Sequence, residues 1–294
     1  MVPSIGRLLG ECIDYSGLTG LQEYTVEETV DRYLRYQSGF EGWVLSRFVC
    51  PAKMLHELSE NLADISLQVP FPVAVLGRTT STAAEWEDEL AYCAEAMNEF
   101  DSATPDLVEV AAFEICPPSS VPDMAILRDL KGFSEVDVFI EAPLRGAWES
   151  LLVAIAESDW AMVKLDLSGA KRPDSFAVAK LVHESLALEL PFKIVQGKGS
   201  IITNSSEIGL INLFGAVAIG MAEDLSKREI EAALIDSEWT HWRFDADKIA
   251  YRGWEADLTA IDQAREIILD AQCSSVEFPL EELSTLGLPT AGED

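Results

Sequence analysis

Short apolar or β-branched runs alternate with longer amphipathic stretches through the middle of the chain. Alternation of this kind is typical of βα units and a parallel sheet. The apolar runs predict strands near 43–50, 73–77, 107–115, 136–141, 161–166 and 192–195. The amphipathic stretches predict a helix after each strand, over 52–62, 81–100, 123–133, 147–158, 174–189 and 206–224. Six such units leave room in the chain for two more.

The two ends of the chain are less regular. The last part predicts a strand or hairpin over 240–252, a helix over 257–271 and a final strand over 274–278, and the start predicts helices over 4–13 and 26–37. No Pro-, Gly- and Ser-rich linker divides the chain, so we expect one domain over 1–294. It would comprise N-terminal helices (1–40), six βα units (43–224) and the last strands and helix (225–294). Eight units predict an α/β fold of the (β/α)8 TIM-barrel type, with an open doubly wound parallel sheet as the alternative.

Composition narrows the class of partner and compartment. The chain has 51 Asp and Glu against 21 Lys and Arg, a formal charge of −30, so we expect neither nucleic acid nor an anionic membrane surface as a partner. The five cysteines are odd in number and form no C-x-x-C pair, which argues against disulfides and zinc. The N-terminus lacks the pattern of a signal peptide, and the longest apolar run, Leu210 to Ala222, is too short for a membrane helix. We therefore expect a soluble, cytoplasmic protein.

Single charged residues interrupt the apolar runs of five predicted strands. They are Arg47, Glu109, Glu141, Lys164 and Lys193. Facing the helices, such charges would be buried without partners at a cost of several kcal/mol each. We therefore expect them to point into the barrel lumen, where they can form ion pairs or reach water.

Lys164 and Asp166 share a strand face close to the carboxyl end, where barrels carry their active sites, and Lys193 lies on the next strand. Two neighbouring lysines lower each other's pKa, and a neutral amine can form a Schiff base with a carbonyl substrate. Glu109, Glu141 and Asp166 are then candidate acid/base groups. The alternative is a structural layer of salt bridges, with Lys164 paired to Glu141 and Arg47 to Glu109.

The segment Gln196-Gly197-Lys198-Gly199-Ser200 is rich in glycine, follows a strand and precedes a helix. Its backbone amides are candidates for holding an anion, with Lys198 and Ser200 as substrate-binding residues. A flexible loop over the barrel mouth is the alternative. Ser205 or Ser206 is expected to be the N-cap of the helix that follows.

The histidines and cysteines carry less information. His56 and His183 are expected to point outward or to pack on helices. His241 belongs to an aromatic segment over 239–254, which suggests stacking on a sugar or ring, a homo-oligomer contact, or packing against the barrel's closing strands. Asp245 and Asp247 begin a calcium-loop pattern that lacks its glycine and terminal glutamate, so an EF-hand is rejected. Cys273 is a candidate thiol nucleophile or substrate contact, but no predicted histidine lies beside it, which favours a buried structural cysteine.

Six short motifs, in order along nearly the whole chain, resemble a family of uncharacterised bacterial proteins with a TIM-barrel-like fold. The matching stretches are Ile13–Leu18 with Val30–Tyr33 and Leu45–Pro51 ("DYAGL … RY … LxRFVxP"), Lys164–Leu165 ("KLRTGG"), Pro191–Lys193 ("PFKATAGLHHP"), Gly209–Leu213 ("GFLN"), Tyr251–Gly253 ("WRG") and Cys273–Ser274 ("GSCSF"). The resemblance implies a barrel and the position of a site, with Arg47, Lys164, Lys193 and Cys273 as shared residues. It implies no reaction.

The chain departs from that family pattern at two places. Asp166 stands where the pattern has an arginine, and Lys198-Gly199-Ser200 stands where it has a histidine pair. A substrate or metal site built on those groups in relatives would be altered or lost in this chain.

Three functions remain open from the sequence. The first is a lyase of the aldolase type that acts on a small carbonyl or carboxylate compound through Lys164 and Lys193, with no cofactor. The second is a degenerate, non-catalytic barrel that binds a ligand or a protein partner and keeps the lysines for internal pairing. The third is a hydrolase or isomerase that holds Mg²⁺ or Mn²⁺ through Glu109, Glu141 and Asp166.

Overall fold

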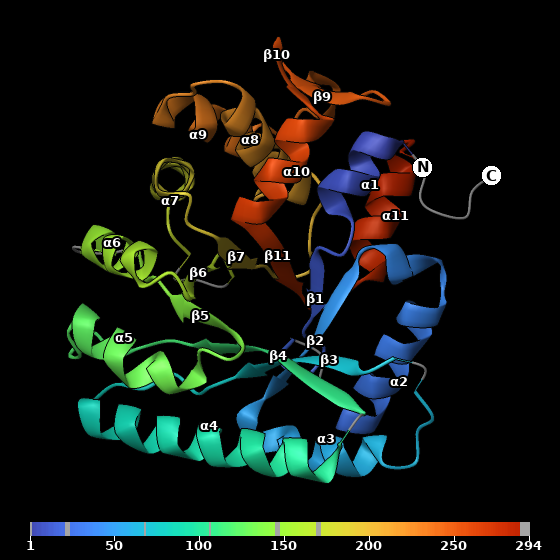
Figure 1. The fold of residues 1–294 in the computed structure, drawn as a ribbon. Helices are drawn as coiled ribbons and strands as arrows, with labels where there is room; N and C mark the ends of the chain where they lie inside the picture. The colour runs from blue at the N-terminus through green and yellow to red at the C-terminus, as the bar shows by residue number, and fades with distance from the viewer. Residues whose placement is uncertain are drawn as a thin grey trace.

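The computed structural model describes residues 2–20, 24–67, 69–105, 107–144, 148–168 and 172–288. Within these ranges, eight parallel strands close into a barrel in the order β1-β11-β7-β6-β5-β4-β3-β2 (Figure 1). The barrel strands are β1 (Ile13–Tyr15), β2 (Leu45–Pro51), β3 (Phe71–Leu76), β4 (Val108–Ile115), β5 (Asp137–Glu141), β6 (Ala161–Asp166), β7 (Phe192–Val195) and β11 (Ile268–Cys273). The predicted (β/α)8 fold is confirmed, and the open doubly wound sheet is wrong.

Helices surround the barrel and pack against it (Figure 1). Those that follow barrel strands are α2 (Val26–Ser38), α3 (Leu55–Leu62), α4 (Ala83–Ala103), α5 (Asp123–Leu130), α6 (Trp148–Ser158), α7 (Ser175–Leu188), α8 (Leu210–Ala222) and α11 (Glu277–Thr285). Local capping sets where several begin. The Thr25 hydroxyl accepts from the Glu28 amide while the Glu28 carboxylate accepts from the Thr25 amide, which closes a capping box at the start of α2.

An insertion between the seventh and eighth barrel strands covers α8. It consists of α9 (Lys227–Ile235), an antiparallel sheet of β8 (Trp242–Phe244), β9 (Lys248–Tyr251) and β10 (Trp254–Asp257), and α10 (Leu258–Ile267), which runs straight into β11. Helix α8 is apolar on all sides and buried over most of its length, so it needs cover on its outer face as well. Trp242 supplies part of that cover, lying so close to Gly215 that a β-carbon there would clash with its ring.

The aromatic segment over 239–254 therefore serves first as internal packing. Trp242 and Tyr251 are buried, with ring centroids 4.6 Å apart, whereas Trp239 and Trp254 are only partly covered. His241 and Tyr251 both contact the Asp236 carboxylate at 2.8 Å, which ties the small sheet to the end of α9. The prediction of a homo-oligomer contact on this segment stays a prediction.

The ends of the chain differ from the sequence-based prediction. The first barrel strand, β1, was missed because it has three residues, too few to show a period of two. It falls between α1 (Pro3–Leu9) and α2, where a helix over 4–13 was expected. The predicted final strand over 274–278 is wrong: the eighth strand is β11, and the predicted helix over 257–271 ends at Ile267 instead. Ala147, expected to start a helix, and residues 1 and 289–294 of the predicted domain lie outside the described residues.

The core has two parts. The larger lies between the strands and the surrounding helices, and a small one fills the middle of the lumen with Val49, Ala74, Ala112 and Phe139. Charged side chains lie on both sides of Phe139 along the barrel axis: the Lys193 ammonium is 5.0 Å from its ring centroid and the Arg47 guanidinium 5.8 Å. The lumen therefore holds an upper cluster near the carboxyl ends of the strands (Lys164, Lys193, Glu114, Glu141) and a lower cluster near the amino ends (Arg47, Asp137, Asp270).

Candidate active site

Lys193, the second residue of β7, is fully enclosed in the lumen. Its ammonium donates to the Asp14 carboxylate on β1 and to Glu114 Oε1 on β4 at 2.6 Å, and both carboxylates are themselves fully buried. Burial alone would lower the pKa of this amine, but the two carboxylates outweigh it and hold the pKa well above its usual range. Lys193 is therefore a permanent internal cation.

Glu114 joins the two lysines. Its Oε1 accepts from Lys193, and its Oε2 lies 3.1 Å from the Lys164 ammonium. Burial would raise the pKa of this carboxyl, but the two lysines lower it to about 2. The carboxylate stays ionised across the physiological range, so it positions the lysines and does not exchange protons.

Lys164 on β6 lies directly opposite Lys193 and Glu141 in the strand register. Its amine is 3.1 Å from Glu114 Oε2 and 3.9 Å from Glu141 Oε2, and its side chain is 6% exposed, while Glu141 is 23% exposed. The predicted pairing of Lys164 with Glu141 is confirmed, with Glu114 as a closer partner that the prediction lacked. Of the two lysines, Lys164 is the one at the edge of solvent.

Asp166 ends β6 two residues beyond Lys164. Its carboxylate accepts from the Ser168 amide at 2.8 Å and from the Ser168 hydroxyl at 2.6 Å. These contacts fix the start of the loop that follows β6. Asp166 thus lies at the carboxyl end of the barrel, as the strand pattern predicted.

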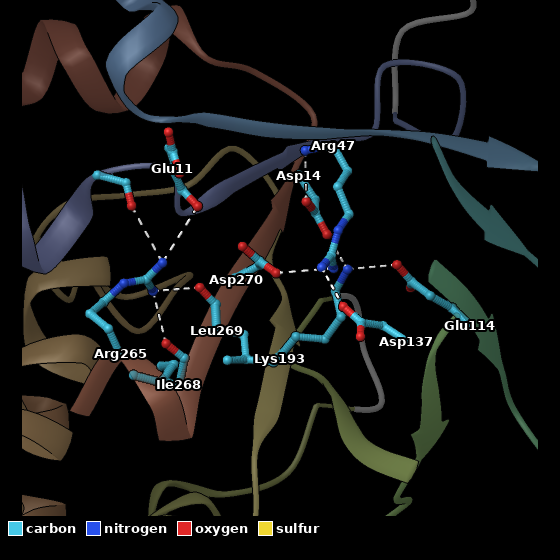
Figure 2. Close-up of polar contacts among 11 residues, drawn as sticks. Glu11, Asp14, Arg47, Glu114, Asp137, Lys193, Arg265, Ile268, Leu269 and Asp270 are labelled. Carbon is cyan, nitrogen blue, oxygen red and sulfur yellow. Dashed lines mark hydrogen bonds and ion pairs between the residues drawn. The ribbon is translucent and has the colours of Figure 1, made fainter. Parts of the chain in front are cut away.

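Arg47 organises the lower cluster (Figure 2). Its guanidinium is 2.6 Å from Asp137 and 3.3 Å from Asp270, and its backbone amide donates to Asp14 at 3.0 Å. Burial raises the pKa of Asp270 to about 7, the nearby Asp14 carboxylate adds to that rise, and Arg47 and Lys193 offset it only in part. The predicted pairing of Arg47 with Glu109 is wrong among the described contacts, because the guanidinium is taken by these aspartates.

Glu109 lies far from the other candidate acids. It is exposed near the amino end of β4, where it lines a depression of about 810 Å³ together with Arg47, Asp137 and Trp160. Glu141 and Asp166 lie at the opposite, carboxyl ends of their strands. The Mg²⁺ or Mn²⁺ ligand set of Glu109, Glu141 and Asp166 is therefore not assembled, and the described residues contain no other group of three His, Cys, Asp or Glu placed to hold a metal.

The glycine-rich loop after β7 has its amides occupied by the chain itself. The amides of Lys198 and Ser200 donate to the Glu207 carboxylate, at 2.9 and 3.0 Å. The Lys198 side chain is exposed and its ammonium lies 5.7 Å from the ring centroid of Phe278, while Ser200 is buried and accepts from Asn204. The two amides are thus already occupied, and direct substrate binding by Lys198 and Ser200 stays a prediction.

The predicted cap of the next helix is also corrected. Helix α8 begins at Leu210 with Gly209 as its N-cap, and the residues expected to cap it form a turn instead. In that turn the Asn204 side-chain oxygen accepts from the amides of Ser206, at 2.7 Å, and Glu207, at 3.0 Å. An Asn side chain that binds amides two and three residues on competes with the helix and delays its start.

Cys273 ends β11 and is completely buried. Burial raises the pKa of its thiol well above the usual value, so the thiolate is scarce at neutral pH. Its sulfur lies against Gly199, where a β-carbon would come within 2.8 Å. The cysteine therefore fits the structural alternative, since it is closed off from both substrate and base.

Four charged residues of the lumen were not predicted from the sequence. They are Asp14, Glu114, Asp137 and Asp270. Glu114 interrupts the apolar run Phe113-Glu114-Ile115 just as Glu109 interrupts the same strand five residues earlier, so the pattern alone did not distinguish them. Asp14 and Asp270 belong to the two barrel strands, β1 and β11, that the prediction did not place.

The comparisons with known proteins support the fold. The structure is similar to one described as the unique tetrameric structure of deoxyribose phosphate aldolase from Aeropyrum pernix, with a TM-score of 0.52 and 15% sequence identity over 97% of this chain and 96% of that one. No family model and no curated protein matches the chain, so membership of the bacterial family described above stays a prediction. Among the described residues, no helix combines the length and apolar character needed to cross a membrane. At this identity the similarity supports the TIM-barrel fold alone and shows nothing of the reaction.

Proposed function

We propose that the chain is a lyase of the aldolase type in which Lys164 forms a Schiff base with a small aldehyde or ketone. The observation that carries the proposal is the placement of Lys164 and Lys193 at the same level of adjacent strands, bridged by Glu114. Lys164 is the amine at the edge of solvent, and Lys193 is the buried permanent charge beside it. The similar fold of an aldolase is consistent with this chemistry, but the proposal rests on the lysines.

Each chemical step has a group in reach. The Lys164 nitrogen attacks the carbonyl carbon, a C–N bond forms and water leaves, giving an iminium ion. The bond between the α and β carbons breaks, and its electron pair flows to the iminium nitrogen to give an enamine. The proton of the β-hydroxyl passes to a carboxylate, and the β carbon leaves as the carbonyl of the first product. Glu141, 3.9 Å from the amine and partly exposed, is placed to take that proton. It returns the proton to carbon, and water then hydrolyses the imine to release the second product.

Lys193 and Glu114 act as positioning residues in this scheme. Lys193 holds the Glu114 carboxylate in place, and Glu114 in turn holds the Lys164 side chain. When Lys164 reacts, its ammonium beside Glu114 is replaced by an iminium that also carries one positive charge. The net charge of the cluster is therefore unchanged by the step.

Reductive trapping tests the proposal. The protein is incubated with a small aldehyde and cyanoborohydride, and the labelled lysines are identified by peptide mass spectrometry. We expect Lys164 to be labelled at least about tenfold faster than exposed lysines, because a placed amine gains effective molarity. Lys180, which pairs with Glu149 at the surface, is the internal reference. Labelling of Lys164 at or below the rate of Lys180 would overturn the proposal.

A matched pair of variants separates the amine from its charge. Lys164→Arg keeps a cation beside Glu114 but forms no imine, so we expect it to fold and to lose the lumen adduct and any turnover. Lys180→Met changes only a partly exposed pair and is expected to label and turn over as the wild type does.

One observation favours a second function, a barrel without catalysis. Lys193, Glu114 and Asp14 are fully enclosed and paired with one another, as in a purely structural layer. In that case Lys164 also serves only as a partner of Glu114. This function predicts no preferential labelling of Lys164, together with a loss of stability in Lys164→Met that matches the loss of a buried ion-pair partner.

A further inference from the structure

The loop after β7 has the backbone geometry of an anion site. The amides of Lys198 and Ser200 converge on one carboxylate, that of Glu207. Gly199 between them has φ +85°, a conformation that other residues rarely adopt, and it turns the two amides to the same side. A β-carbon on Gly197 would lie 2.3 Å from Glu207 Oε1, so glycine at that position lets the carboxylate approach.

A second carboxylate closes the same loop. The amide of Ile201, the next residue along, donates to Glu282 Oε2 of α11 at 2.6 Å. The loop is also tied to the end of the eighth strand, because the Ser274 amide and hydroxyl donate to the Gly197 carbonyl at 3.0 and 2.9 Å. Three amides at the carboxyl end of the barrel are thus satisfied by two acidic side chains of the chain itself.

The loop lies at a position where many TIM barrels bind the phosphate group of a substrate. In TIM barrels the loops after the seventh and eighth strands commonly form the phosphate site of the substrate, with backbone amides as donors. In this chain the seventh strand is β7 and the eighth is β11. The loop after β7 carries the converging amides and is hydrogen-bonded to Ser274, the residue that follows β11.

We propose that Glu207 is an internal anion that fills this site and makes the barrel mouth selective for carbonyl substrates that carry no phosphate or carboxylate group. The word substrate here rests on the proposed Schiff-base function; the occupied anion site does not. A further feature acts in the same direction: Glu141 and Asp166 add negative charge at the same end of the barrel.

Phosphate binding by a variant tests the anion site without any activity. Glu207→Ala removes the carboxylate and frees the amides of Lys198 and Ser200. We expect inorganic phosphate to raise the melting temperature of this variant and to bind it at least about tenfold more tightly than the wild type in calorimetry, since hydrogen bonds to a charged group are strong. The matched control is Glu229→Ala, which removes a carboxylate from a backbone amide, that of Ser226, in a capping box away from the barrel mouth.

The outcomes are decisive in each case. Equal responses to phosphate in wild type, Glu207→Ala and Glu229→Ala would overturn the proposal. If Glu207→Ala loses its circular dichroism signature of folding, recovery of the fold on addition of phosphate supports an anion site, and failure to recover overturns it.

The selectivity is tested with two aldehydes that differ by one phosphate group. We expect glyceraldehyde to label Lys164 of the wild type in reductive trapping and its 3-phosphate to label it at least about tenfold less, with the ratio moving toward one in Glu207→Ala. An unchanged ratio in the variant would overturn the selectivity role. Absence of any Lys164 labelling would instead overturn the Schiff-base function and leave the phosphate-binding result to stand by itself.

Discussion

The upper and lower clusters of the lumen bury the same types of charge and shift their carboxyl groups in opposite directions. In the upper cluster two lysines share Glu114, and its pKa falls to about 2. In the lower cluster Asp270 shares Arg47 with a second aspartate and lies near Asp14, and its pKa rises to about 7. Both carboxyl groups are buried, so burial does not decide the sign. The sign depends on the closest charges: Glu114 has lysine ammonium groups at 2.6 and 3.1 Å, whereas Asp270 has Arg47 at 3.3 Å and the repelling Asp14 carboxylate nearby.

The difference assigns separate roles to the two ends of the lumen. The upper cluster is locked in its charged form, which suits a scaffold that holds an amine in place. The lower cluster contains a carboxyl group that gains or loses its proton near neutral pH. Asp14 links them, because it accepts from the Lys193 ammonium and from the Arg47 amide. A change at one end therefore has an electrostatic route to the other.

Removing the central cation should break the upper cluster and gives the largest expected effect. Lys193→Met leaves Asp14 and Glu114 buried with one cation fewer, and we expect it to lower the free energy of unfolding by about 3–5 kcal/mol. Urea unfolding followed by circular dichroism measures the loss. Lys180→Met is the control and should change it by about 0.5 kcal/mol or less. A Lys193→Met protein as stable as this control would show that the cluster does not hold the barrel together.

Glu114→Gln tests the depressed pKa of the upper cluster. The folded-state pKa of about 2 lies below the ordinary value of 4.5, so the ionised carboxylate stabilises the fold above pH 4.5, and that contribution is lost as the pH falls toward 2. We expect the variant to be less stable than the wild type by on the order of 2–3 kcal/mol at neutral pH. Unfolding measured across acid pH should show the difference shrinking between pH 4.5 and 2. A difference independent of pH would contradict the assignment.

Asp270→Asn tests the lower cluster, where the sign is reversed. The folded-state pKa of about 7 lies above the ordinary value of 3.8, so the protonated carboxyl stabilises the fold below pH 3.8. This contribution decreases as the pH rises from 3.8 and is fully lost above pH 7. Asn cannot ionise, so the stability of the variant relative to the wild type should rise from pH 4 to 7 by on the order of 2 kcal/mol and then level off. A relative stability that stays constant over this window would mean that the nearby cations dominate and that the pKa of Asp270 is not raised.

How much of the fold could be predicted from the sequence depended on strand length. The six strands with four to eight residues between β2 and β7 carry enough apolar positions to be read from the pattern. β1 has three residues, and β11 follows α10 without a loop, so the apolar run of the strand is continuous with the apolar face of the helix. Closure of the barrel depends on these two strands pairing with each other, a contact between residues about 260 positions apart that local pattern does not encode.

The candidate site shows a similar division. Lys164, Lys193 and Glu141 were found because each interrupts an apolar strand, and the structure brings them into one cluster. The same criterion, a charge within an apolar strand, also selected Glu109. It could not identify Glu207, because Glu207 lies in a loop and no periodicity indicates that its carboxylate accepts from loop amides. A register shift in β4 between Val110 and Ala112 pairs Glu109 with Pro72 and Glu114 with Leu76. The two glutamates therefore lie on the same strand face, at opposite ends of the strand, and the pattern of alternation does not reveal this.

The smallest expected effect comes from that pair of glutamates on one strand. Glu109 is exposed near the amino end of β4, whereas Glu114 is enclosed between two lysines, so Glu109→Gln should change the free energy of unfolding by about 0.5 kcal/mol or less where Glu114→Gln costs several times more. The two substitutions are chemically identical, and urea unfolding at neutral pH compares them directly. In a chain with a net charge of −30, removing one negative charge should by itself be favourable. Equal losses in the two variants would therefore mean that the stability does not depend on the ion pairs of the cluster. A large loss of stability in Glu109→Gln alone would indicate that Arg47 pairs with Glu109, and it would contradict the contrast between the two ends of the lumen.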